Sequence, residues 1–153
     1  MLRERFTTEM KEAMKAGDKA KLATVRMIQA ALKDKDIEAR GLGKEPASEE
    51  EILALLQKMI KQRNESAAVY DQGGRPELAE TERAEAAIVA SYLPQQMDEA
   101  QTKAAIANAI AETGAAGPKD MGKVIAALKG QFAGQMDFGK ASGLVKEALN
   151  AKG

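Results

Sequence analysis

Four lysines in the last third of the chain have the charge and spacing to contact phosphate groups. Lys119 and Lys123 are four residues apart, so a helix places them on one face. Lys129 and Lys140 lie on either side of a loop that contains Gly134. Lysine side chains are common donors to phosphate oxygens in nucleic-acid complexes. The alternative interpretation is a solvated face on a protein of zero formal net charge.

A second group of polar residues lies in the first two thirds of the chain, on two helices that a short turn must make antiparallel. Arg63 and Tyr70 are expected to face Glu82 or Glu85. The whole group is Lys58, Arg63, Glu65, Tyr70, Arg75, Glu82 and Glu85. It could form a pocket for a small substrate, or an ion network that fixes how the helices pack. We favour the network, because such pairs are common between amphipathic helices.

Two residue types that often carry catalysis are missing, so that only Ser-Lys, Thr or carboxylate arrangements remain. The sequence has no histidine and no cysteine, which removes the common general base and the thiolate nucleophile. No serine lies in a Gly-x-Ser-x-Gly motif, and Met121-Gly122-Lys123 lacks the remainder of a phosphate-binding loop. The acidic run Glu49–Glu51 suits the first turn of a helix better than a metal site. We expect a non-catalytic protein without a cofactor or metal.

The composition indicates an all-α protein. The chain has 153 residues, 44% of them hydrophobic and only 3% aromatic, which is too few rings for a base-stacking surface. Lysine plus arginine equals aspartate plus glutamate at 23 each, so an anion site must be a local patch. No apolar run is long enough to span a bilayer, and the first residues do not resemble a secretory signal. These features favour a cytoplasmic protein.

The first part of the sequence predicts four helices. The first carries Leu2, Phe6, Met10 and Met14, with Ala13 as a further candidate, on its inner face and stops at Gly17. Asp18 caps the second, which buries residues up to Ile37, with Asp36 and Arg40 paired on its outside. Ser48 opens the third with a capping box. Pro76 begins the fourth, whose predicted inner face is formed by Leu78, Ala84, Ile88 and Tyr92.

Three further helices are expected after Pro94. Asp98 begins one that stops at Gly114, Pro118 or Asp120 begins the next, and Asp137 caps the last. Gly122 in the middle helix predicts a close approach of two helices, because glycine costs helix stability without such a reason. The predicted organisation is a four-helix lobe over 1–94 and a three-helix lobe over 95–153.

Two blocks of sequence resemble a known family. The first runs from Lys58 to Ser66, and Tyr70, Gly74-Arg75, Leu78-Ala79, Glu82 and Tyr92-Leu93-Pro94 follow it. The second runs from Lys119-Asp120-Met121-Gly122-Lys123-Val124 to Leu149. Together they resemble the YqeY-like proteins of the GatB/YqeY family. The second block is also similar to the C-terminal domain of GatB, the tRNA-binding subunit of the glutamine-dependent tRNA amidotransferase.

The resemblance implies an α-helical lobe followed by a small three-helix lobe that contacts tRNA. Carried over to this sequence, the contacts are Lys119, Lys123 and Lys140, to which we add Lys129. The leading hypothesis is an accessory protein that binds tRNA or an aminoacyl-tRNA enzyme complex. A protein-interaction module or homodimer without an RNA role is the alternative. A third reading is the family-level label of carbon–nitrogen ligase activity with glutamine as amido donor, whose nucleophile and ATP site are not visible here.

Overall fold

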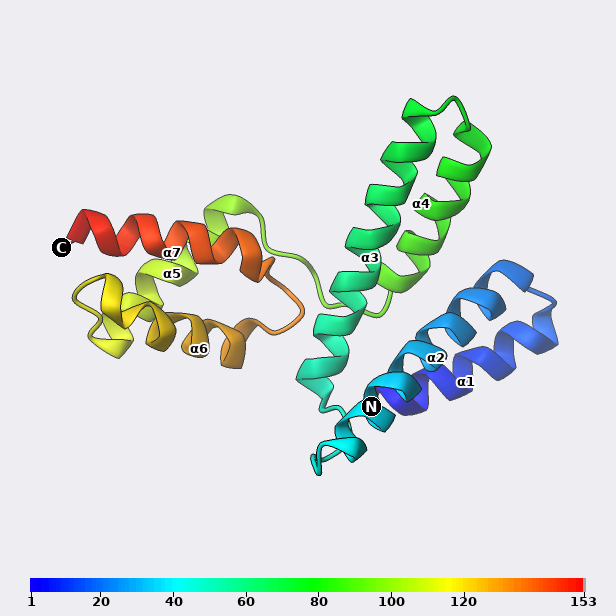
Figure 1. The fold of residues 1–153 in the computed structure, drawn as a ribbon, viewed down its shortest axis with the longest axis horizontal. Helices are drawn as coiled ribbons and strands as arrows, with labels where there is room; N and C mark the ends of the chain where they lie inside the picture. Colours follow the sequence, from blue (N-terminus) through cyan, green and yellow to red (C-terminus); the bar gives the residue numbers. More distant parts are fainter. Residues whose placement is uncertain (153) are drawn as a thin grey trace. The chain divides into compact units, whose positions relative to one another are not determined.

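The computed structural model describes residues 1–152, and over that range the chain is helical without strands (Figure 1). This confirms the predicted all-α fold, with four helices followed by three. The helices are α1 (Leu2–Ala16), α2 (Lys19–Gly41), α3 (Glu49–Gln72), α4 (Pro76–Ala90), α5 (Glu99–Thr113), the short 3₁₀ helix η1 (Pro118–Asp120), α6 (Met121–Phe132) and α7 (Phe138–Lys152).

The chain divides into two compact units, Met1–Leu93 and Pro94–Gly153. In unit 1, α1 and α2 form one antiparallel hairpin and α3 and α4 form another (Figure 1). Side chains from all four helices fill its core: Leu2, Phe6, Val25, Ile28, Leu32, Ile52, Leu56, Met59, Val89 and Tyr92. Burying each large apolar side chain contributes about 1.5–3 kcal/mol, so this shared core holds the two hairpins together.

The predicted inner faces of α1 and α2 were wrong at their ends. Met14 is 52% exposed and Ile37 is 54% exposed, whereas Ala13 is buried. A helix turns about 100° per residue, so Ala13 lies within about 20° of Leu2 around α1, while Met14 lies about 120° away. Ile37 is similarly about 180° from Ile28. A spacing of four residues advances about 40° around the helix at each step, so three such steps from Leu2 carry Met14 off the buried face. Ala13, the further candidate, is the residue that is buried.

The α3–α4 hairpin continues beyond the shared core of unit 1. In this distal part the residues buried between the two helices are alanines, namely Ala67 of α3 with Ala79 and Ala86 of α4. The expected inner position of Ala84 was wrong, because this residue is exposed about 140° from Ala79 around the helix. Small residues let the two backbones approach closely, so the hairpin stays paired with little large apolar packing.

Unit 2 is a three-helix bundle around one apolar core. Ile106 of α5, Val124 and Leu128 of α6, and Val145 and Leu149 of α7 are all buried in it. The segment before α5 is joined to the α6–α7 loop: the Met97 amide donates to the Gln135 carbonyl at 2.8 Å. Gly134 has a φ of 79°, which favours glycine in this turn. The loop therefore helps to close the bundle.

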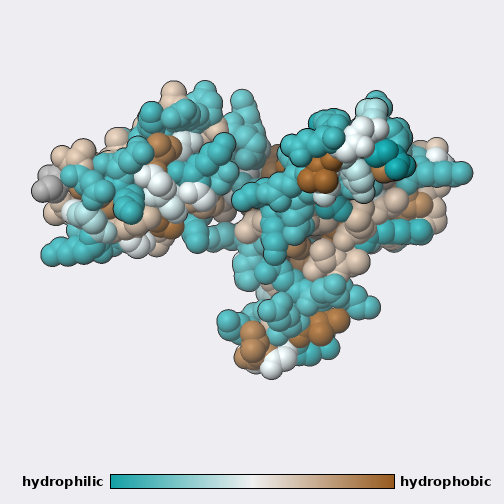
Figure 2. All heavy atoms as spheres, turned by 45° about the horizontal axis from the view of Figure 1, so that its top comes forward, coloured by the Kyte–Doolittle hydropathy of each residue, from teal (hydrophilic) through white to brown (hydrophobic). Residues whose placement is uncertain are grey.

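The face in Figure 2 is largely hydrophilic, with hydrophobic residues in small separate patches. Scattered apolar residues of this kind are normal on a protein surface and do not by themselves indicate a partner. Within residues 1–152, no helix combines the length and hydrophobicity needed to cross a membrane.

Candidate nucleic-acid interface

The first pair of candidate lysines lies at the start of α6. Lys119 is in η1 and Lys123 is in the first turn of α6, and both are exposed. Between them, Asp120 accepts a hydrogen bond from the Ala116 amide at 2.9 Å. This bond, together with the charges of Lys123 and Lys119, lowers the pKa of Asp120. The carboxylate partly offsets the positive charge, so this end of the helix is only moderately cationic.

The second pair lies at the other end of α6. The Lys129 ammonium lies 6.0 Å from the centre of the Phe138 ring, which holds it near the start of α7. Lys140 is exposed in the first turn of α7, where its amide donates to Asp137 at 3.2 Å. Lys123 and Lys129 are six positions apart, which corresponds to about 9 Å along a helix. Unit 2 therefore presents two separated pairs of cations.

These four lysines share one further property. In the described part of the chain, none of them forms an ion pair with a carboxylate. Their ammonium groups are therefore available to an external anion. This placement is compatible with phosphate contacts and requires no rearrangement of unit 2.

The prediction for Gly122 was wrong. The residue is exposed, and a Cβ built on it would meet no atom within 4 Å. No helix approaches closely enough to require glycine at this position. The prediction assumed that a glycine, which destabilises a helix, is present only where another helix packs closely against it. Gly122 lies in the first turn of α6, and the space around its Cα is open.

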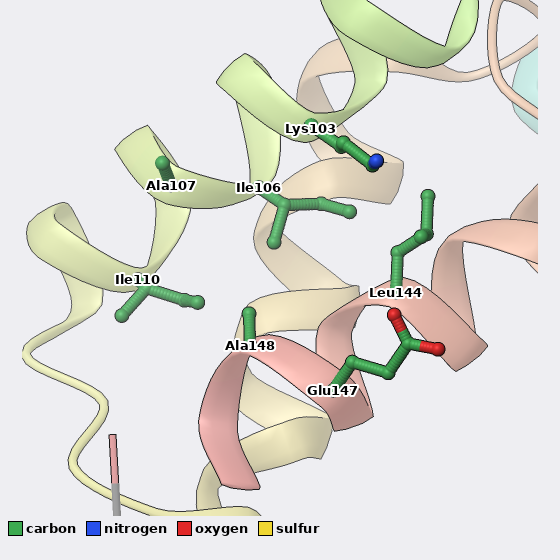
Figure 3. A pocket seen from close by; sticks show the side chains of 7 residues that line it. All are labelled: Lys103, Ile106, Ala107, Ile110, Leu144, Glu147 and Ala148. Carbon is green, nitrogen blue, oxygen red and sulfur yellow. The ribbon is translucent and has the colours of Figure 1, made fainter. Parts of the chain in front are cut away.

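A shallow apolar groove lies between α5 and α7, on a part of unit 2 that contains none of the four lysines. Ile106 and Ile110 of α5 and Leu144 of α7 line it, and its volume is about 450 Å³. Figure 3 shows Lys103 and Glu147 at its edge, on the two facing helices. Lys103 pairs with Glu99 at 3.2 Å. Lys103 and Glu147 are the titratable side chains of its lining.

The polar group of unit 1 does not assemble into one pocket. Arg63 Nε lies 3.3 Å from Glu85 Oε2, so this pair joins α3 to α4 as expected. Arg75 instead pairs with the neighbouring Glu77 at 2.9 Å. A second contact between the helices joins Arg83 to Asp71, which the sequence argument did not include.

Lys58 and Glu65 are exposed, as are the partners Arg75 and Glu77. The expected contacts of Tyr70 and Glu82 with this pair are not among those observed. The arrangement supports helix packing rather than a substrate pocket.

Arg63 also reaches α2. One terminal nitrogen lies 2.7 Å from the Met27 sulfur, and the other donates to the Met59 carbonyl at 3.4 Å. Its side chain is only 13% exposed. A nearly buried guanidinium needs a carboxylate partner to offset the lost hydration, and Glu85 supplies it.

Sequence reasoning missed a cluster at the start of α1. Arg3 binds both oxygens of Asp36 and also donates to the Ala47 carbonyl at 2.9 Å. The Ala47 amide donates to Asp36 at 2.9 Å, so one carboxylate holds α1, α2 and the loop before α3. The expected Asp36–Arg40 ion pair is replaced by the Arg3 pair, and Arg40 acts on Asp36 only through its charge. The partners are 33 residues apart, and no local spacing could reveal them.

A second missed cluster surrounds Tyr92. Glu9 accepts from Arg5 at 3.1 Å and pairs with Lys21 at 3.2 Å. Burial opposes ionisation of Glu9, but the bonds from Lys21 and Arg5 outweigh it and lower its pKa. Arg5 also stacks 4.7 Å from the centre of the Tyr92 ring. These contacts join α1 to α2 and to the end of α4, so they have a structural role.

No group of three or more carboxylates within residues 1–152 is arranged to hold a metal ion. Unit 2 offers two features that could serve a function, its exposed lysines and its apolar groove. The sequence model of one family, described as "Yqey-like protein", matches residues 3–149. The chain belongs to the YqeY-like family. The match includes both units, and it confirms the family that the two sequence blocks indicated.

Curated relatives of this YqeY-like protein come from yeasts. It is 31% identical over 106 residues to "Altered inheritance of mitochondria protein 41, mitochondrial" of Lachancea thermotolerans, covering 68% of this chain and 55% of that protein. It is 34% identical over 94 residues to the protein of the same name in Clavispora lusitaniae, covering 60% and 52%. The chain spans about half the length of the curated relatives it matches.

These names correct one expectation. The relatives are designated mitochondrial, which contradicts the prediction of a cytoplasmic protein. Composition and the missing signal pattern were the only grounds for that prediction. Neither property distinguishes the cytoplasm from the interior of an organelle, so the inference was broader than the residues allowed.

Proposed function

We propose that this YqeY-like protein is a non-catalytic accessory protein that binds tRNA through unit 2. The observation that carries the proposal is the set of four exposed lysines without carboxylate partners, Lys119, Lys123, Lys129 and Lys140. Phosphate contacts supply most of the sequence-independent affinity of a protein for nucleic acid. The resemblance of this unit to the C-terminal domain of GatB favours tRNA over other polyanions.

The two lysine pairs suit an extended ligand better than a small one. They lie at opposite ends of α6, so one compact anion cannot contact both, whereas successive phosphates of an RNA backbone can. The neighbouring Asp120 limits the positive potential at one end. We therefore expect modest affinity that rests on several weak contacts, as for a protein that recognises an RNA surface without reading its sequence.

The direct test replaces all four lysines by glutamine and measures tRNA binding by fluorescence anisotropy. A matched control replaces four exposed lysines of unit 1, namely Lys11, Lys15, Lys19 and Lys61. Both variants lose the same formal charge. Binding that is lost only in the unit 2 variant supports the proposal. Equal loss in both variants would show an unspecific charge effect, and no loss in either would reject it.

The α5–α7 groove favours a second candidate, a protein-interaction module that receives an apolar helix of a partner. Ile106 and Leu144 would supply the apolar contacts, with Lys103 and Glu147 at the edge (Figure 3). Sedimentation of the purified chain with and without tRNA distinguishes the two candidates. A stable protein complex that contains no RNA would favour this one.

A further inference from the structure

The loop between α2 and α3 in unit 1 forms a second, more enclosed cationic site that none of the arguments above uses. A pocket of about 430 Å³ lies there, and its lining residues are Arg3, Asp36, Arg40, Lys44 and Pro46. Three of the five are cations. Pockets for small molecules commonly span about 300–1,000 Å³, so this one has room for a phosphate group and part of the molecule attached to it.

Arg3 is held in place before any ligand arrives. Two of its nitrogens bind Asp36 at 2.8 and 2.9 Å, and one of these also binds the Ala47 carbonyl. A guanidinium has five N–H donors, and these three bonds leave two of them. A cation whose orientation is already fixed loses little conformational freedom when it binds an anion.

Asp36 does not cancel the site. Its two oxygens accept bonds from Arg3 and from the Ala47 amide, so its charge reduces the positive charge of the pocket, and Arg3 offsets part of it. With Asp36 subtracted, the lining side chains keep a formal charge of +2. The nearby C-terminal end of α2 contributes about half a negative charge. Glu49 acts on Arg3 and Glu51 on Lys44 through their charges, so the positive charge of the pocket is smaller than its lining side chains alone give.

Arg40 and Lys44 are the two exposed cations of the pocket, and their charges act on Asp36 and Glu51, respectively. Neither forms an ion pair within the described range. They are four positions apart, with Gly43 at a φ of 70° between them, where the chain leaves α2. The turn brings Lys44 back beside the end of the helix, because its amide donates to the Ala39 carbonyl at 2.8 Å.

We propose that this pocket binds a phosphate group, either inorganic phosphate or the phosphate of a small phosphorylated molecule, through Arg40, Lys44 and the remaining donors of Arg3. Planar guanidinium groups and a flexible ammonium are the usual combination for a tetrahedral oxyanion. The site is in unit 1 and involves none of the lysines assigned to tRNA. It therefore stands independently of the proposed function.

The test is a titration of the ¹⁵N-labelled full chain with inorganic phosphate and, separately, with phenyl phosphate at constant ionic strength. Saturable shifts are expected at the amides of Leu42, Gly43, Lys44 and Ala47. Binding of both probes indicates a site for a phosphorylated molecule, and binding of inorganic phosphate alone indicates a site for the free ion. Shifts confined to residues 119–140, or no saturable shift at all, would overturn the proposal.

Two variants complete the test. R40Q/K44Q removes both exposed cations, and K19Q/R26Q removes an exposed lysine and arginine from the same helix away from the pocket. The first should raise the dissociation constant about tenfold or more, since it deletes charge-assisted bonds. The second should leave it within about twofold. Equal constants in the two variants would contradict the assignment, and because all four residues are exposed, neither change should unfold the chain.

Discussion

Arg3 and Asp36 form a two-bond ion pair across 33 residues of sequence, Nη1 to Oδ2 at 2.8 Å and Nη2 to Oδ1 at 2.9 Å. The same carboxylate accepts from the Ala47 amide, so the start of α1, the second half of α2 and the entry to α3 meet at one side chain. This arrangement orders the α2–α3 loop. Arg3 and Asp36 also line the cationic pocket proposed above.

Replacing Asp36 by alanine should destabilise unit 1 by about 1–3 kcal/mol, since it leaves the Ala47 amide without its acceptor and Arg3 with the Ala47 carbonyl alone. Urea unfolding can be followed by near-ultraviolet circular dichroism, because Tyr70 and Tyr92 are the two tyrosines of the chain and both report on unit 1. Asp34→Ala on the exposed side of the same helix is the control, with an expected change below about 0.5 kcal/mol.

The same residue predicts a pH dependence. The bonds from Arg3 and from the Ala47 amide lower the pKa of Asp36 from 3.8 to about 2. A lowered pKa in the folded state gives stability that is present above the unfolded value and lost as the pH falls. Unit 1 should therefore lose stability between about pH 4 and pH 2. In D36N this part of the loss should disappear, and an unchanged acid profile would contradict the assignment.

Tyr92 makes the corresponding prediction at high pH. Burial, followed by the nearby charge of Glu9, raises its pKa to about 12. A raised pKa gives stability that is present below the ordinary value of 10.0 and lost as the pH rises toward 12. Tyr92→Phe keeps the edge contact with Phe6 and the stacking of Arg5. The variant should therefore retain its stability between pH 10 and 12 better than the wild type, measured by thermal unfolding.

The Arg63–Glu85 pair should matter more than the exposed pairs of unit 1. Glu85→Gln removes the charge that offsets a guanidinium with only 13% exposure, and we expect a loss of about 1–3 kcal/mol. Glu77→Gln breaks the Arg75 pair, which is well exposed and screened by solvent, and should have a clearly smaller effect. Equal effects in urea unfolding would show that burial does not determine the contribution of these pairs.

Local signals in the sequence predicted the helices well. Ser48 with Glu51 and Asp98 with Gln101 form the capping boxes that begin α3 and α5, and Gly17 and Gly114 end α1 and α5 in the left-handed conformation. Each of these signals depends on residues at most four positions apart. Helix type and approximate limits could therefore be read without tertiary information.

Contacts between distant parts of the chain could not be predicted. Asp36 has an obvious local partner in Arg40, and only the fold shows that Arg3 takes its place. Gly122 suggested a packing contact that the structure does not have. Arg63 with Glu85 was predictable because a short turn forces α3 and α4 to run side by side. The deciding factor is whether the chain between two residues fixes their geometry.

The central claim is that unit 2 contacts phosphates of tRNA, and the salt dependence of binding tests it most directly. The affinity of the wild-type chain for total tRNA should be measured by fluorescence anisotropy between about 50 and 200 mM salt. Each phosphate contact contributes about 0.7–0.9 to the slope of log K against log salt. The slope is negative, and we predict that its magnitude is smaller by about three in the variant with Lys119, Lys123, Lys129 and Lys140 replaced by glutamine than in the wild type. An unchanged slope, or no binding at about 50 mM, would contradict the account.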